Sequence, residues 1–261
     1  AVPLMGIVVM PAGVVAALLS GVGLAGPALW VMEKGTWAIL RVADWVAGLD
    51  GAVAAVPTPP PLTLPLMALG GLAVLIARPI PLRAAGGVAT IAALTLWASA
   101  ERPALLVAGD GSIIGVMGET GRALSKPKGA GFVAKSWLED DGDLAAQEDA
   151  FARPGLAGDK GTLQTTVAGH PAWHFTGKGA SARAASACAE DSLVILSTDW
   201  EGPVPPGCRI YDVAKLRDTG ALAVYSTGDG LRIVSAKEVA GQRLWNTRPG
   251  RSRDRRRAEL Q

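Results

Sequence analysis

The sequence predicts a polytopic α-helical membrane segment followed by a soluble α/β domain. Three observations support this fold class. The first hundred residues hold seven formally charged side chains, whereas the remaining 161 hold 41. Long apolar runs fill the first part, and short strand-like runs between turn residues fill the second. The change at Glu101–Arg102 is abrupt, which argues against a freely diffusing cytosolic enzyme.

We therefore expect three parts along the chain. Residues 1–102 form the membrane part, residues 103–246 the soluble domain, and residues 247–261 an Arg-rich, disordered tail. The soluble part is mildly acidic, so no basic groove for nucleic acid is visible in it. The chain starts inside an apolar run without a basic leader, so we expect the C-terminal part of a longer membrane protein.

Three apolar stretches are candidate membrane spans, at residues 4–20, 62–77 and 84–100. Each is short for a crossing, which needs about twenty residues. Their frequent Gly and Pro are compatible with close helix packing or broken helices in a membrane. Buried core helices of a soluble protein are the alternative interpretation.

Residues 30–49 have the pattern of an amphipathic helix. Apolar residues fall on one side, and the other side mixes charge with indole, which is typical of a helix lying at the headgroup boundary. A second interpretation is a surface on which single-stranded bases stack. The candidate interface residues are Trp30, Lys34, Trp37, Arg41 and Trp45. A Pro-rich connection at residues 56–61 then excludes helix.

Orientation follows from the loop at residues 78–83, which carries two arginines and no acid. Such loops lie on the cytoplasmic side of a membrane. One further crossing then places the soluble domain outside the cytoplasm.

The soluble part opens with a predicted β-hairpin, in which residues 104–109 and 112–117 are joined by Asp110-Gly111. Further strands are expected at residues 132–138, 165–175, 192–197, 209–212, 221–226 and 231–235, with a short helix at 144–151. The mixture indicates layers of helices and sheets. Two cysteines, Cys188 and Cys208, are either two buried thiols or one disulfide, and a disulfide requires an oxidising compartment.

In the order of these pieces the chain resembles the C-terminal portion of the ComEC competence family, which translocates DNA, in its alphaproteobacterial form. Three stretches carry the resemblance across most of the chain. The first is the end of the membrane part with its Trp-rich segment and Pro-rich linker. The second is the hairpin at 105–114, and the third includes residues 188–196 and 210–221.

The resemblance implies a channel in the bacterial inner membrane that passes single-stranded DNA into the cell, with the lipid bilayer and other competence proteins as partners. It also implies a metallo-β-lactamase-like soluble domain, an αββα sandwich in complete or shortened form. In that fold a His-x-His-x-Asp-His loop holds two metals that activate water. This chain has only two histidines, His170 and His174, so we expect a degenerate domain without catalytic residues, metal ligands or cofactor.

Two acidic features have simpler explanations than a site. Asp110 belongs to the hairpin turn, which needs no catalytic role. The run Glu139, Asp140, Asp141 and Asp143 offers oxygen ligands for a hard cation, but we interpret it as a solvated turn.

The leading hypothesis is part of a DNA-uptake channel with a non-catalytic soluble domain. The alternatives are a membrane-anchored, metal-dependent phosphodiesterase and an extracytoplasmic binding or assembly domain without a DNA role.

Overall fold

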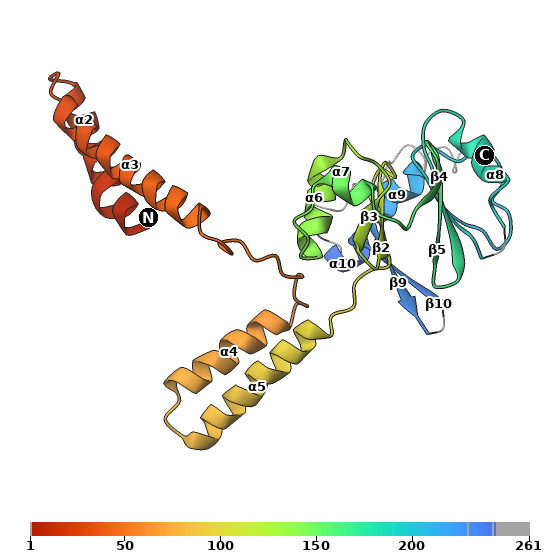
Figure 1. The fold of residues 1–261 in the computed structure, drawn as a ribbon, viewed down its shortest axis with the longest axis horizontal. Helices are drawn as coiled ribbons and strands as arrows, with labels where there is room; N and C mark the ends of the chain where they lie inside the picture. The colour runs from red at the N-terminus through yellow and green to blue at the C-terminus, as the bar shows by residue number, and fades with distance from the viewer. Residues whose placement is uncertain (1, 190, 229, 242, 244–261) are drawn as a thin grey trace, which may run out of the picture. The chain divides into compact units, whose positions relative to one another are not determined.

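The computed structural model of the chain describes residues 2–189, 191–228, 230–241 and 243. By packing, the chain divides into two compact units, Ala1–Ala55 and Val56–Gln261, which we describe separately (Figure 1). The predicted tail at 247–261 lies outside the described residues.

The first unit is a pair of antiparallel helices. A continuous helical run is formed by α1 (Val2–Leu4), the π-helical turn η1 (Met5–Val9) and α2 (Met10–Ser20). After a short turn it is followed by α3 (Gly26–Ala47). The two helices approach closely at Gly35, where an added Cβ would lie 2.9 Å from Val9 Cγ2. Small residues at such contacts are typical of membrane helix pairs.

The helix α3 differs from the predicted segment 30–49 at both ends. It begins four residues earlier because Pro27 occupies the first turn, where a missing N–H costs nothing. It ends at Ala47, with Gly48 as its C-cap.

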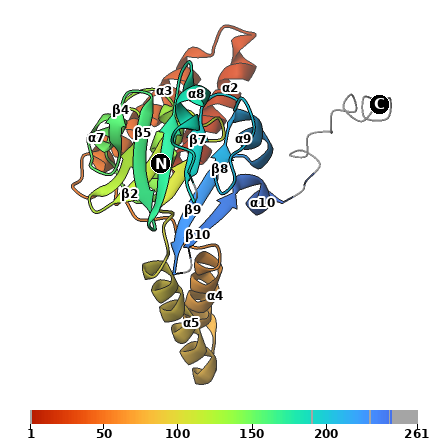
Figure 2. The same ribbon diagram turned by 90° about the vertical axis from the view of Figure 1, so that its right-hand side faces the viewer.

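The second unit begins with a helical hairpin of α4 (Thr63–Ile76) and α5 (Ile80–Ala98), which lie side by side (Figures 1 and 2). Gly70 and Gly86 face each other at the contact, since an added Cβ on either would lie 2.7 Å from the other's carbonyl oxygen. The backbones are therefore in direct contact, which no larger side chain would permit.

The loop is shorter than the predicted range 78–83, because α5 starts at Ile80 and not near residue 84. Pro81 is accepted in the first helical turn, so the connection shrinks to residues 77–79. Arg83 therefore lies on α5 and donates from Nε to the Val74 carbonyl at 3.1 Å.

Two helices among the described residues, Val2–Ser20 and Ile80–Ala98, are long and apolar enough to cross a bilayer. The predicted span at 62–77 corresponds to α4, whose 14 residues extend about 21 Å and fall short of a hydrocarbon core of about 30 Å.

The soluble region holds two five-stranded sheets. The first is antiparallel throughout, in the order β10-β9-β1-β2-β3. Its strands are β1 (Leu105–Val107), β2 (Ile114–Gly118), β3 (Gly121–Leu124), β9 (Leu222–Thr227) and β10 (Gly230–Ser235).

The second sheet is mixed, with β6-β7-β8 parallel and β4-β5-β6 antiparallel. Its strands are β4 (Ala157–Asp159), β5 (Thr162–Val167), β6 (His170–Phe175), β7 (Leu193–Leu196) and β8 (Arg209–Tyr211). All four residues of β7 are buried, as expected for a strand covered on both faces.

Helices cover the outer faces of both sheets. Between the sheets lies a core that includes Leu105, Val107, Leu193 and Ile195. Residues of α6 (Gly131–Asp140) and α7 (Gln147–Phe151) form a second cluster with Leu124, on the other face of the first sheet. Residues of α8 (Ala180–Ala185) pack on the second sheet. The remaining helices are α9 (Val213–Thr219) and α10 (Ala236–Ala240).

A buried ion pair joins the first sheet to the end of α6. Arg122 on β3 is fully buried, and its Nε and Nη2 donate to the two oxygens of Asp141 at 2.5 and 3.1 Å. The same guanidinium donates to the carbonyls of Gly115 and Pro103. The expectation that the acidic run is a solvated turn is therefore wrong for Asp141, because Arg122 beneath α6 needs a buried anion.

Replacing Arg122 by Met should destabilise the protein by about 3–5 kcal/mol, because Asp141 is left buried without a cation. Equilibrium urea unfolding followed by near-ultraviolet circular dichroism measures the change. The double variant Arg122→Met/Asp141→Leu should recover most of the loss. Lys128→Met is the control, since the Lys128–Glu148 pair is exposed and contributes under about 1 kcal/mol. If Arg122→Met lowers the free energy of unfolding as little as Lys128→Met does, the buried ion pair does not stabilise the protein in the way described.

Candidate nucleic-acid interface

Five side chains form one stripe along α3. Trp30, Lys34, Trp37, Arg41 and Trp45 follow one another at spacings of four, three, four and four residues. At about 100° per residue they fall within about 80° of each other, and at 1.5 Å per residue they extend over about 22 Å. Aromatic rings and cations alternate along this stripe, which we call the Trp–cation face.

Each cation of this face lies over an indole one turn before it. Lys34 Nζ is 5.9 Å from the Trp30 ring centroid, and Arg41 Cζ is 5.7 Å from that of Trp37. The three indoles are exposed in the unit described, at 59% for Trp30, 58% for Trp37 and 67% for Trp45. The structure thus brings all five predicted residues together on one accessible surface.

The opposite side of α3 contacts the preceding helical run. Ala28 and Gly35 are buried there, and Met32 lies beside Gly13. These positions are about half a turn away from the Trp–cation face. The packed side and the Trp–cation face are therefore separate surfaces of one helix.

Acidic side chains border the Trp–cation face along one edge. Glu33 accepts from Lys34 Nζ at 3.3 Å, in an exposed pair. Asp44 lies on the same edge, about 60° from Arg41 on the helical wheel. A face of this composition can stack planar rings on its indoles and pair anionic phosphate with its cations.

The two histidines lie on strand β6 and not on a helix. Four residues along a strand place them about 13 Å apart, too far to share a metal whose ligands bind at about 2 Å. Among the described residues no three His, Cys, Asp or Glu side chains come together. These residues therefore do not fit the two-metal centre of a metallo-β-lactamase-like fold.

His174 is part of the core between the sheets. Its side chain is buried, and Nε2 lies 2.9 Å from the Gly111 carbonyl oxygen, so Nε2 carries the proton of this hydrogen bond. Nδ1 has no hydrogen-bond partner within the described part of the chain. Burial lowers the pKa of His174 from 6.5 to about 4, outweighing the bond to Gly111, which raises it.

Asp110 keeps the turn before β2 in place. Its Oδ1 accepts from the Ser112 backbone N–H at 2.9 Å. Burial alone would raise the pKa of Asp110, but the hydrogen bonds from Ser112 outweigh it and lower the pKa below the usual value. The predicted two-residue hairpin turn is longer in the structure, because β1 ends at Val107 and β2 begins at Ile114.

The acidic run is bound to other parts of the second unit. Thr58 donates from Oγ1 to Asp140 at 3.0 Å and from its backbone N–H to the Asp140 carbonyl at 2.8 Å. Asp143 accepts from Arg153, and this hydrogen bond lowers the pKa of Asp143. The described contacts of these carboxylates are with protein groups.

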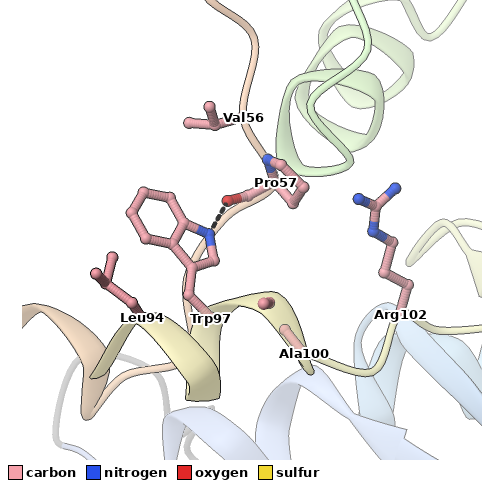
Figure 3. Close-up of a pocket in the computed structure, with 7 residues that line it drawn as sticks. Val56, Pro57, Leu94, Trp97, Ala100 and Arg102 are labelled. Atoms are coloured by element: carbon pink, nitrogen blue, oxygen red, sulfur yellow. Dashed lines mark hydrogen bonds between the residues drawn. The ribbon is translucent and has the colours of Figure 1, made fainter. Parts of the chain in front are cut away.

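The Pro-rich linker lies between α5 and α6. Trp97 near the end of α5 donates from Nε1 to the Pro57 carbonyl at 2.8 Å, and Figure 3 shows the indole pointing at that oxygen. On the other side, Gly142 at φ +72° approaches the linker so closely that a Cβ would lie 2.7 Å from Pro57 N. A cavity of about 380 Å³ opens here, with Leu94 and Arg102 among its lining residues (Figure 3).

A disulfide joins Cys188, after α8, to Cys208, just before β8. Their Cα atoms are 5.5 Å apart, and Cys208 belongs to the cluster of apolar residues under α8.

Sequence reasoning missed Arg122, Trp97 and Thr58 as contact residues. For Arg122 no strand was predicted, because β3 is only four residues long, and its partner Asp141 lies 19 residues away. For Trp97 and Thr58 the partners are 40 and 82 residues away, so no local pattern could identify them.

Comparison with known proteins finds a match for the first part of the chain. Residues 1–80 match the family model described as Competence protein. The matched stretch includes the helices α1 to α4 and with them the whole Trp–cation face. No curated protein and no solved structure matches the chain. The match supports a competence-related protein.

His174 predicts a loss of stability in mild acid. The unfolded chain binds a proton near pH 6.5, whereas the folded chain binds it only near pH 4. The stabilisation from neutral His174 is therefore complete above about pH 6.5 and lost as the pH falls towards 4, a change of about 3 kcal/mol. Urea unfolding at half-unit pH intervals measures it.

In His174→Gln the side-chain amide can still donate to Gly111 but does not titrate, so the slope between pH 6.5 and 4 should disappear. His170→Gln is the matched control and should keep the slope. An unchanged slope in His174→Gln would assign the effect to other groups.

Proposed function

We propose that the chain forms part of an inner-membrane channel for the uptake of single-stranded DNA in natural transformation. The observation that carries this proposal is the match of residues 1–80 to the competence family, which includes the helix with the Trp–cation face. The two apolar helices that are long enough to cross a bilayer support a multi-pass arrangement. The lipid bilayer and other competence proteins are the expected partners.

The soluble region is, in this proposal, a non-catalytic, metallo-β-lactamase-like αββα sandwich. Support for the fold comes from two sheets with a shared core and helices on their outer faces. The separation of His170 from His174 and the bond of His174 to Gly111 support a structural role for these side chains.

We place the soluble domain outside the cytoplasm. The Cys188–Cys208 disulfide supports this, because disulfides persist in oxidising compartments and are rare in the cytosol. The two arginines near the α4–α5 connection, Arg78 and Arg83, support a cytoplasmic location for that end of the hairpin.

Deletion of the gene should abolish both the uptake of labelled DNA and transformation, and the wild-type gene should restore both. Normal uptake in the deletion strain would reject the proposal and favour a binding or assembly domain without a DNA role.

The double variant His170→Gln/His174→Gln tests the non-catalytic domain. It should restore transformation as well as the wild type does, because neither imidazole takes part in chemistry. A failure to restore transformation at normal protein level, together with metal-dependent phosphodiesterase activity of the purified wild type, would instead indicate a membrane-anchored hydrolase.

Cys188 and Cys208 should be oxidised in growing cells. After acid quenching, a maleimide-polyethylene-glycol reagent should modify neither cysteine unless the protein is first reduced. The Cys188→Ser variant is the control and should expose Cys208 to the reagent. Free thiols in the wild-type protein would place the soluble domain in a reducing compartment.

A further inference from the structure

We propose that α3 crosses the membrane beside the first helix and that its Trp–cation face lines the water-filled path of the channel, in contact with the passing single strand. This inference rests on the proposed function for the identity of the strand. The placement of α3 itself rests on packing, which can be tested separately.

The contacts between the two helices fix how far along the first helix each α3 residue lies. Gly35 packs against Val8 and Val9, and Met32 lies beside Gly13. Glu33 and Lys34 therefore lie level with the stretch from Val9 to Gly13, which is the middle of the apolar run Val2–Ser20. If that run crosses the bilayer, this charged pair lies near the midplane.

The same contacts disfavour a helix lying flat at the headgroup boundary. The pair is antiparallel and α3 packs on both η1 and α2, so both helices share one orientation in the membrane. The 22 residues of α3 extend about 33 Å, enough for a bilayer core of about 30 Å.

Charge at the membrane midplane is costly unless it faces protein or a water-filled cavity. Glu33, Lys34 and Arg41 all lie on the side of α3 that faces away from the first helix. That side must therefore be shielded from lipid. A path wide enough for a nucleic acid provides this shielding with water.

The residues of the Trp–cation face match the chemistry of a single strand. Bases stack on exposed indoles with little dependence on sequence, as a channel for arbitrary DNA requires. Lys34 and Arg41 alternate with the indoles at positions where phosphates would pass. Glu33 and Asp44 at the edge limit the cationic charge, so the strand is not held too tightly to move.

Accessibility from the two sides of the membrane tests the placement of α3. In full-length protein in sealed vesicles, Trp30→Cys and Trp45→Cys should react with a membrane-impermeant maleimide from opposite sides. Val42→Cys is the matched control, because Val42 is exposed in this unit but lies off the Trp–cation face and opposite Glu33 on the helical wheel; it should react from neither side. The native cysteines are bonded to each other and do not react.

Reaction of both positions from the same side would show a flat helix and overturn the proposal. Reaction of Val42→Cys as fast as that of Lys34→Cys would also overturn it, because no face would then be distinguished. Neither result depends on whether the protein takes up DNA.

Contact with the strand has its own test. A single-stranded oligonucleotide should slow the reaction of Lys34→Cys and Arg41→Cys with a small thiol reagent. Trp37→Ala should lower the transformation frequency by about tenfold, the loss expected for one stacking ring, whereas Trp37→Phe keeps most of it. Val42→Ala should leave it unchanged. Unprotected cysteines or a fully active Trp37→Ala would reject the DNA contact, even in a strain where deletion abolishes uptake.

Discussion

The second unit depends on the desolvated contact between Arg122 and Asp141. Neither ion is stable away from water alone, so the strand that carries Arg122 and the helix end that carries Asp141 must meet. This contact also sets the position of the neighbouring Asp140, whose carboxylate accepts a hydrogen bond from Thr58 in the linker. The linker in turn accepts the Trp97 indole. One ion pair therefore connects the sheet, through the end of α6 and the linker, to α5.

Part of this architecture could be predicted from the sequence, because its signals are local, but the strand expected at residues 132–138 is wrong, since these residues lie in the helix α6. The change in charge density at Glu101 separates the apolar, helical part of the chain from the part that holds the two sheets, and the all-apolar run at β7 indicates a strand buried on both faces. Helix ends were predicted less well. Proline in a sequence usually indicates that a helix is interrupted, but in the first turn it has the backbone angle that a helix needs. Pro27 and Pro81 both extend helices that a hydropathy pattern begins later.

Of the candidate site, the sequence predicts the face of the helix but not the contacts of that helix. Helical periodicity places Trp30, Lys34, Trp37, Arg41 and Trp45 on one face, and the structure retains that face. Periodicity cannot show what the other faces contact, and the level of Lys34 along the first helix follows only from the packing of Gly35 on Val9. The acidic run shows the same limit, because its partner Arg122 lies 19 residues away from Asp141 on another element.

The first strand of the soluble domain follows α5 directly and lies in the centre of its sheet. Leu105, Leu106 and Val107 each pair with β2 on one side and with β9 on the other. Any pulling force on residues 101–103 would therefore enter the domain at its central strand. Pulling out that strand requires both ladders to break together, whereas an edge strand would peel away one bond at a time. The domain is thus attached to the α4–α5 hairpin at a strand that two ladders hold in place.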